Sequence, residues 1–150
     1  MGSRRVSDRF LLSDPPTATE QNQAREWITQ QLTEFFVNLE SRPEVMLAVA
    51  GTATSAISVR ERMTVYDPAR VHGSVMLVGE LAAITNHLAA LSEQGRQRVV
   101  GLEPERASVI IGGLLVLQTI LEVCELPSFI VSESDILQGI LLDGFKRYHG

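Results

Sequence analysis

Several residue types are scarce in this sequence of 150 residues, and each scarcity excludes a class of protein. The single cysteine, Cys124, cannot form an internal disulfide, which favours a reducing compartment and a cytoplasmic protein. The longest charge-free apolar stretch, Ala107 to Leu121, is shorter than the ~20 residues that a membrane-spanning helix needs. It therefore predicts a buried helix in a soluble protein, with no membrane as partner.

Positive charge is scarce as well. The net charge of -5 argues against nucleic-acid binding, which relies on a basic surface. Twelve of the thirteen basic residues are nevertheless arginine, whose planar guanidinium matches phosphate oxygens, so a local phosphate site stays open. His72, His87 and His149 have no metal-ligand spacing to one another or to Cys124, and we therefore predict no metal cluster within this chain.

What is present predicts one α/β domain over residues 1–150, because 45% of the residues are hydrophobic and short apolar runs alternate with helical periodicity. The segment "RRVSDRFLL" is interpreted as a strand that the prolines of "SDPPT" end, and "VYDPARVHGSVM" as irregular. The predicted strands are "VMLAVA" and "SFIV". The predicted helices are Thr19–Leu39, Thr52–Arg62, Leu77–Leu91, Pro104–Glu122 and a final helix capped by Ser132, with a short helix or loop after the cap residue Ser92.

Strands that are apolar throughout indicate helices on both faces of the sheet. The helices outnumber the few strands. A sheet with so few strands leaves an edge that needs a partner, so we expect a homodimer.

The stretch "AVAGTATSAIS" is the strongest candidate for a site, because small residues stand where a strand turns into a helix. Gly51 allows close approach to the backbone, and the hydroxyls of Thr52 and Thr54 can donate to an anionic oxygen at the helix N-terminus. The alternative is a helix packed tightly on its sheet with a threonine cap. Local physics leaves these two interpretations level.

Two further segments carry candidate residues. In "GLEPERA", Arg106 can pair with a phosphate or hold the neighbouring loop, although a solvated helix terminus explains the same residues. In "YDPARVHG", His72 can act as a phosphate donor or an acid–base group, or it can be an ordinary hydrogen-bonded surface side chain. These residues make a plausible anion pocket without a catalytic base.

Taken in series, "SDPPT", "AVAGTAT", "YDPARVHG", "GLEPERASVII" and "IVSESDILQGILLD" resemble the exopolyphosphatase/guanosine pentaphosphate phosphohydrolase (Ppx/GppA) family, most closely its actinobacterial branch. The resemblance implies half of an actin-like ATPase (ribonuclease-H-like) fold, corresponding to most of the second subdomain. It also implies that the first subdomain, the catalytic glutamate and most ligands of a Mg²⁺ cofactor lie outside this chain.

The resemblance carries over residue by residue. Gly51 and Thr52 match the second glycine and the threonine of the family's Gly-Gly-Thr loop, where Ala50 replaces the first glycine. Arg106 matches the "PERAD" segment, in which Ser108 stands for the usual aspartate. Leu137 stands where many members have arginine.

Two functions follow from the resemblance. The first is one wall of the cleft in a hydrolase that releases terminal phosphate from polyphosphate or guanosine pentaphosphate (pppGpp), with the chain inactive alone. The second is a non-catalytic module that binds polyphosphate or nucleotide, which the substitutions at Ala50, Ser108 and Leu137 favour.

Overall fold

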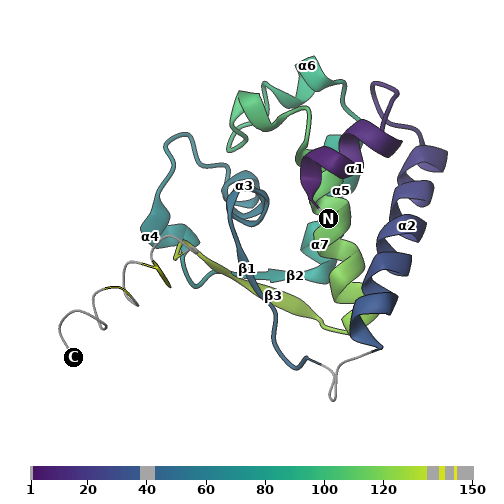
Figure 1. The fold of residues 1–150 in the computed structure, drawn as a ribbon. Coiled ribbons are helices and arrows are strands. Elements are labelled where there is room, and N and C mark those ends of the chain that lie inside the picture. Colours follow the sequence, from purple (N-terminus) through teal and green to yellow (C-terminus); the bar gives the residue numbers. More distant parts are fainter. Residues whose placement is uncertain (1, 38–42, 135–138, 141–143, 145–150) are drawn as a thin grey trace.

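The computed structural model describes residues 2–37, 43–134, 139, 140 and 144. Helices dominate the described part, and a small sheet forms its base (Figure 1). The helices are α1 (Ser3–Phe10), α2 (Ala18–Phe36), α3 (Gly51–Arg60), α4 (Pro68–Val71), α5 (Val78–Ala89), α6 (Glu93–Arg96) and α7 (Ile110–Cys124), with a 3₁₀ turn η1 (Pro104–Arg106). The strands are β1 (Leu47–Val49), β2 (Val75–Leu77) and β3 (Ser128–Ser132).

The strand order in the sheet is β1-β3-β2, so the strand that comes last in the sequence lies in the centre. β1 runs parallel to β3, with Leu47 opposite Ile130, and β2 runs antiparallel to β3, with Val75 opposite the same residue. Because β1 and β3 are parallel, their carboxyl ends meet at one edge of the sheet, where ligands bind in open α/β sheets.

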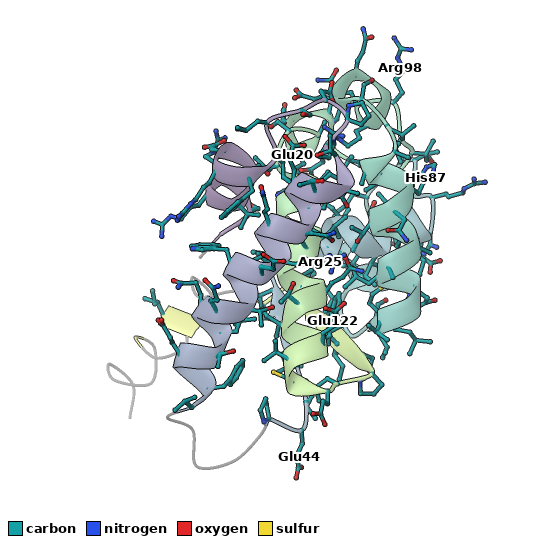
Figure 2. All side chains as sticks on the ribbon, turned by 90° about the vertical axis from the view of Figure 1, so that its right-hand side faces the viewer. Glu20, Arg25, Glu44, His87, Arg98 and Glu122 are labelled. Carbon is teal, nitrogen blue, oxygen red and sulfur yellow. The ribbon has the colours of Figure 1, made fainter. Side chains whose placement is uncertain are left out.

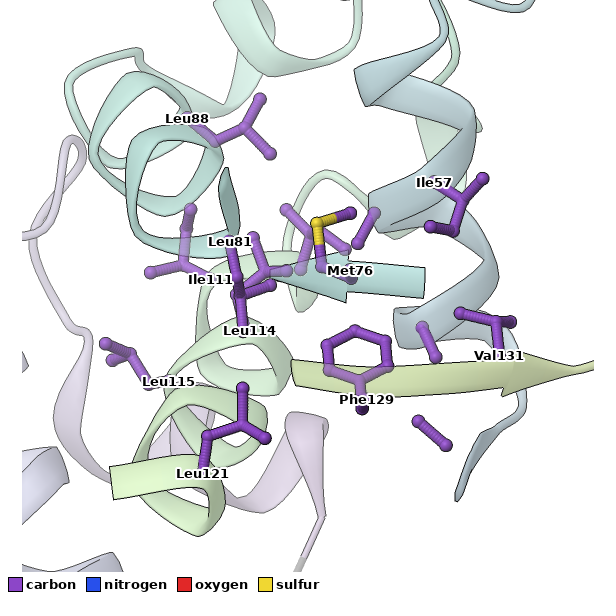
Figure 3. Close-up of a cluster of buried hydrophobic side chains, with 14 of the residues drawn as sticks. Ile57, Met76, Leu81, Leu88, Ile111, Leu114, Leu115, Leu121, Phe129 and Val131 are labelled. Atoms are coloured by element: carbon purple, nitrogen blue, oxygen red, sulfur yellow. The ribbon is translucent and has the colours of Figure 1, made fainter. Parts of the chain in front are cut away.

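The helices pack on one face of this sheet (Figure 1). Met76, Phe129 and Val131 of that face are fully buried against Leu81, Leu114 and neighbouring helix side chains (Figure 3). The opposite face exposes Leu47, Val49, Val75 and Leu77. The expectation of helices on both faces is therefore met on one face only among the described elements, although β1 and β2 are apolar on both sides.

α7 is the central helix of the core and contacts α1, α2, α3 and α5. Gly112 and Gly113 leave room for the close approach of Ser7 in α1 and of Thr52 in α3, which is why those glycines stand inside a helix. α2 lies along α7, and Arg25 bridges the two helices (Figure 2). Its guanidinium donates to Gln118 Oε1 at 2.8 Å and pairs with Glu122 at 3.5 Å.

The first segment is a helix, so its interpretation as a strand was wrong. Val6 and Phe10 stand four residues apart and turn to the core, whereas Arg4, Arg5 and Asp8 are exposed. Packing against α7 thus selects the helix, although residue types alone favoured a strand. The irregular segment also contains regular structure, α4 and β2. β2 was missed because it continues directly into α5 without a turn residue between them.

Other predictions agree with the structure. Helices α2, α3, α5 and α7 and strands β1 and β3 overlap the predicted segments, with ends that differ by a few residues, and Ser92 caps α6 by accepting from the Gly95 N–H at 3.2 Å. The apolar helix begins later than predicted, at Ile110, after the separate turn η1. The predicted final helix falls mostly outside the described residues. Cys124 is buried, and no helix in the described part of the chain is long and apolar enough to span a bilayer.

Candidate functional site

A polar pocket of about 250 Å³ lies where the carboxyl ends of β1 and β3 meet the N-terminus of α3. We call it the α3 pocket. Its lining combines small residues of the strand-to-helix turn with charged and hydroxyl side chains from three other segments. The lining residues are Ala50, Gly51, Thr54, Tyr66, Glu103, Arg106, Ser132 and Glu133.

Arg106 packs directly against Gly51. Its guanidinium occupies the space that a side chain at position 51 would fill, so only glycine permits this arrangement. Nε donates to Glu103 Oε2 at 2.6 Å, which fixes the guanidinium in place and leaves the two Nη groups beside the helix terminus. The side chain is 38% exposed, so those donors are accessible from the pocket.

The N-terminus of α3 has no side-chain cap, because the N-cap residue is Ala50. The first free backbone donors belong to Gly51, Thr52 and Ala53, and no hydrogen bond between described residues uses their N–H groups. Unpaired N–H groups and the positive end of the helix dipole favour an anion. Together with the guanidinium of Arg106, they make this corner of the pocket suited to phosphate.

Ala50 adopts a backbone conformation that favours glycine, with φ 68° and ψ 178°. An alanine pays for that conformation with steric strain of about 1–3 kcal/mol. The turn therefore has a shape that suits glycine, and Ala50 lines the pocket.

Tyr66 and Glu133 close the opposite side of the pocket. The Tyr66 hydroxyl donates to Glu133 Oε1, and burial together with this carboxylate raises the pKa of Tyr66 to about 12. The Glu133 N–H in turn donates to His72 Nδ1 at 3.2 Å, so His72 holds the backbone of Glu133 from behind.

The predicted site residues are only partly brought together. Gly51, Thr54 and Arg106 line the pocket, and Thr54 Oγ1 donates to the carbonyl of Gly51 at 3.3 Å. Thr52 instead turns towards Gly113 of α7, and His72 lies behind the lining. Ser108 lines a separate cavity beside Asp14 and Arg96.

Sequence reasoning missed Tyr66 and Glu133. Glu133 follows directly after the strand "SFIVS", and a residue just beyond the carboxyl end of a buried strand is a reasonable candidate on that ground alone. Tyr66 precedes the turn Asp67-Pro68 and carried no comparable signal. Among the residues that the structure describes, no three His, Cys, Asp or Glu side chains form a group that could hold a metal ion.

The fold and this pocket can now be compared with known proteins. The family model of the Ppx/GppA phosphatases matches residues 1–148, and the chain belongs to the Ppx/GppA phosphatase family. The resemblance of its motifs is thereby confirmed. The chain is 34% identical over 151 residues to the bifunctional 3-dehydroquinate synthase/phosphatase of Fusobacterium nucleatum, and the match covers 98% of this chain and 22% of that protein. It is 32% identical over 148 residues to exopolyphosphatase 2 of Mycobacterium tuberculosis, with coverage of 95% and 46%.

Solved structures agree with the predicted fold. The Ppx/GppA phosphatase of Aquifex aeolicus matches with a TM-score of 0.87 at 25% identity, over 95% of this chain and 46% of that one. An exopolyphosphatase-like protein matches with a TM-score of 0.90 at 25% identity, over 99% and 49%. The prediction of half of a larger fold is confirmed, since the chain spans less than half the length of these relatives.

Proposed function

We propose that this chain forms one wall of the phosphate-binding cleft of a phosphoanhydride hydrolase, which releases terminal phosphate from polyphosphate or guanosine pentaphosphate. The observation that carries the proposal is the Arg106 guanidinium packed on Gly51 at the uncapped N-terminus of α3. Its free Nη groups and the N–H groups of Gly51 and Thr52 are donors that suit phosphate oxygens. Membership of a phosphatase family supports the same substrate chemistry.

The role of this wall is to position the phosphate chain and neutralise its charge. Such preorganised donors stabilise the charge that develops during phosphoryl transfer. Glu103 and Glu133 hold the neighbouring side chains of Arg106 and Tyr66, and neither position matches the catalytic glutamate that the resemblance places outside this chain. We therefore assign the general base to the other half of the family's fold and expect this chain alone to release no phosphate.

The resemblance implies Mg²⁺, but the residues described here do not fit a site for that ion on their own. The two carboxylates of the α3 pocket are held by Arg106 and Tyr66, and Mg²⁺ requires several oxygen ligands in octahedral geometry. We assign its remaining ligands to substrate phosphates and to the other half of the fold, and derive no step through the metal.

Titration of the purified chain with tripolyphosphate, followed by calorimetry, tests the proposal. Arg106→Gln should weaken binding about tenfold, because a charge-assisted hydrogen bond contributes about 1.5–3 kcal/mol. Arg98→Gln is the matched control, since Arg98 is exposed and lies outside the pocket lining. Equal losses in the two variants would show that binding depends on overall charge. Mg²⁺-dependent phosphate release by the chain alone would show that the base is misplaced.

A second candidate function is a non-catalytic binding module for polyphosphate or nucleotide. The strained Ala50 favours it, because the resemblance and the backbone conformation both predict glycine at this position. The upstream reading frame discriminates between the two functions. A catalytic glutamate of the family there supports the hydrolase, and its absence supports the module.

Assembly and location are part of the same proposal. We expect a homodimer, because β1 and β2 are both edge strands of the described sheet and its outer face is apolar. Sedimentation that finds a monomer at all concentrations would contradict this. The cytoplasm is the proposed compartment, because a sequence with a single cysteine cannot form an internal disulfide.

A further inference from the structure

A second cavity lies at the other end of α3, between α3, α5 and the connection that follows α6. We call it the α3–α5 groove. Its volume of about 770 Å³ falls within the range of about 300–1,000 Å³ typical of small-molecule sites. Its lining contains aliphatic residues, which we call the floor, and charged or basic residues, which we call the rim. The floor consists of Val59, Ala83, Ile84, Val99 and Val100.

The rim carries three basic side chains, of which only Arg60 is engaged. Its Nη1 donates to the carbonyl of Val75 at 2.6 Å and to Glu80 Oε2 at 3.2 Å, which satisfies the one acidic residue of the lining. The side chains of Arg62 and His87 are exposed, and neither makes an ion pair or a hydrogen bond with a described residue. The rim thus offers N–H donors and positive charge without a protein acceptor.

Arg62 also stands in an unusual backbone position. It follows the C-terminus of α3 with φ 51°, where glycine or asparagine is the ordinary choice. The chain places a long cation there at a conformational cost, and the side chain gains no described partner in return. Such an outlier beside a cavity points to a ligand that accepts the charge.

We propose that the α3–α5 groove binds an amphipathic anion, with an aliphatic body on the floor and one carboxylate or phosphate head at Arg62 and His87. The floor is aliphatic throughout, so it favours an acyl chain over a nucleobase, which would need an aromatic or planar stacking partner. A polyphosphate has no apolar part to cover this floor and suits the α3 pocket better. The inference is independent of the proposed hydrolase activity.

The outer face of the sheet provides the natural contrast. It is apolar through the uncharged side chains of Leu47, Val49, Val75 and Leu77. A compound that binds only through the hydrophobic effect should bind this face as well as the groove, and an anionic head group should not raise its affinity. Dependence on the head group therefore separates a built site from general hydrophobic adsorption.

The test is a titration of the isotope-labelled chain with decanoate and with decanol, followed by amide chemical shifts. Decanoate should shift amides around the groove and bind about threefold to fivefold tighter than decanol, the factor expected of one exposed ion pair. The double variant Arg62→Gln/His87→Gln should bind both compounds equally. Arg5→Gln, a control for an exposed arginine on α1, should keep the preference.

Ala83→Glu is a second variant that fills the groove and repels the head group, and Ala83 is an exposed helix position at which the change should not prevent folding. We expect it to reduce decanoate binding at least tenfold while the amide spectrum stays folded. A long-chain acyl phosphate analogue can then show which head group is preferred. Equal affinities for decanoate and decanol, shifts confined to β1 and β2, or no binding of either compound would each overturn the proposal.

Discussion

Two arginines in one connection of the chain, between α5 and α7, have opposite surroundings. Arg96 is almost buried, with 6% of its side chain exposed, whereas 38% of the Arg106 side chain is exposed. The Arg96 guanidinium donates to the carbonyls of Ala107 at 2.9 Å and Leu91 at 2.6 Å and pairs with Asp14 at 3.4 Å. Arg106 has a single described partner, Glu103.

The difference separates two uses of the same side chain. A guanidinium has five N–H donors, and at Arg96 the protein itself accepts them on several sides, which ties the connection to the segment before α2. At Arg106 the protein fixes one edge and leaves the other beside Gly51. The first arrangement stabilises the fold, and the second leaves donors for a ligand.

The largest expected difference between the two arginines is the loss of stability when each guanidinium is removed. Arg96→Ala leaves buried carbonyls without donors and should lower the free energy of unfolding by about 3 kcal/mol. Arg106→Ala should cost less than about 1 kcal/mol, because an exposed ion pair contributes little. Urea unfolding of both variants measures the contrast. Similar losses would mean that Arg106 is also structural.

Gly101 and Gly51 should differ in the same way, with a larger loss of stability on substitution of Gly101 than of Gly51. Gly101 has φ 92°, and a side chain there would overlap the backbone carbonyl of Ser58, so Gly101→Ala should cost about 2 kcal/mol or more. At Gly51 the obstacle is the movable guanidinium of Arg106. Gly51→Ala should therefore cost about 1 kcal/mol or less.

The readouts for this pair are urea unfolding and tripolyphosphate titration. Gly51→Ala should lose affinity for tripolyphosphate while it remains folded, because the new methyl group displaces Arg106. Unchanged affinity in that variant would contradict the role assigned to the contact between Arg106 and Gly51.

Ala50→Gly tests the backbone strain in the α3 pocket. Relief of the strained conformation should outweigh the added freedom of the unfolded chain, for a net gain of about 1 kcal/mol in the free energy of unfolding. Thermal unfolding measures the gain, and Ala53→Gly, at a buried helical position, should be destabilised instead. A loss of stability in Ala50→Gly would show that the backbone there is not strained.

The smallest expected effects are those of pH on the free energy of unfolding. One arises near Arg96 and the other in the α3 pocket beside Arg106. Near the Arg96 region, Glu20 accepts from the N–H groups of Thr17, Leu12 and Ser13, and its hydrogen bonds with Thr17 and Ser13 lower its pKa from 4.5 to about 2. The native state prefers the charged form, so its contribution to stability is complete above pH 4.5 and is lost as the pH falls towards 2. Glu20→Gln should weaken this dependence of the free energy of unfolding on pH in the acid range, which we call the acid limb.

In the α3 pocket the sign is reversed. The pKa of Tyr66 rises from 10.0 to about 12, so the native state prefers the neutral phenol. Its contribution is complete below pH 10 and is lost as the pH rises towards 12. Tyr66→Phe should remove this alkaline limb and leave the acid limb unchanged in pH-dependent urea unfolding, with Tyr148→Phe as the control. An alkaline limb that persists in Tyr66→Phe would contradict the assignment.

Local sequence predicted much of the fold, because helical periodicity is strong in α2, α5 and α7 and because small residues mark the turn at Gly51. It also predicted that Gly51, Thr54 and Arg106 lie close together, since these segments follow strands or precede helices at one end of the sheet. Their binding role stays a prediction.

Tertiary packing decided the rest. Nothing in the sequence distinguishes Arg96 from Arg106, because burial depends on Asp14 and on carbonyls that arrive from other segments. The orientation of Thr52 depends on Gly113, which is far away in the sequence. The helical state of α1 depends on its contact with α7 for the same reason.

The central place of β3 has a consequence for how the chain acquires its structure. β1 and β2 do not pair with each other, and each pairs only with β3 in the described sheet. During synthesis neither strand has its partner until residues 128–132 leave the ribosome, although both are made much earlier. Sheet formation is therefore a late, long-range step, and a chain that stops before Ser128 can form helices but cannot form this sheet.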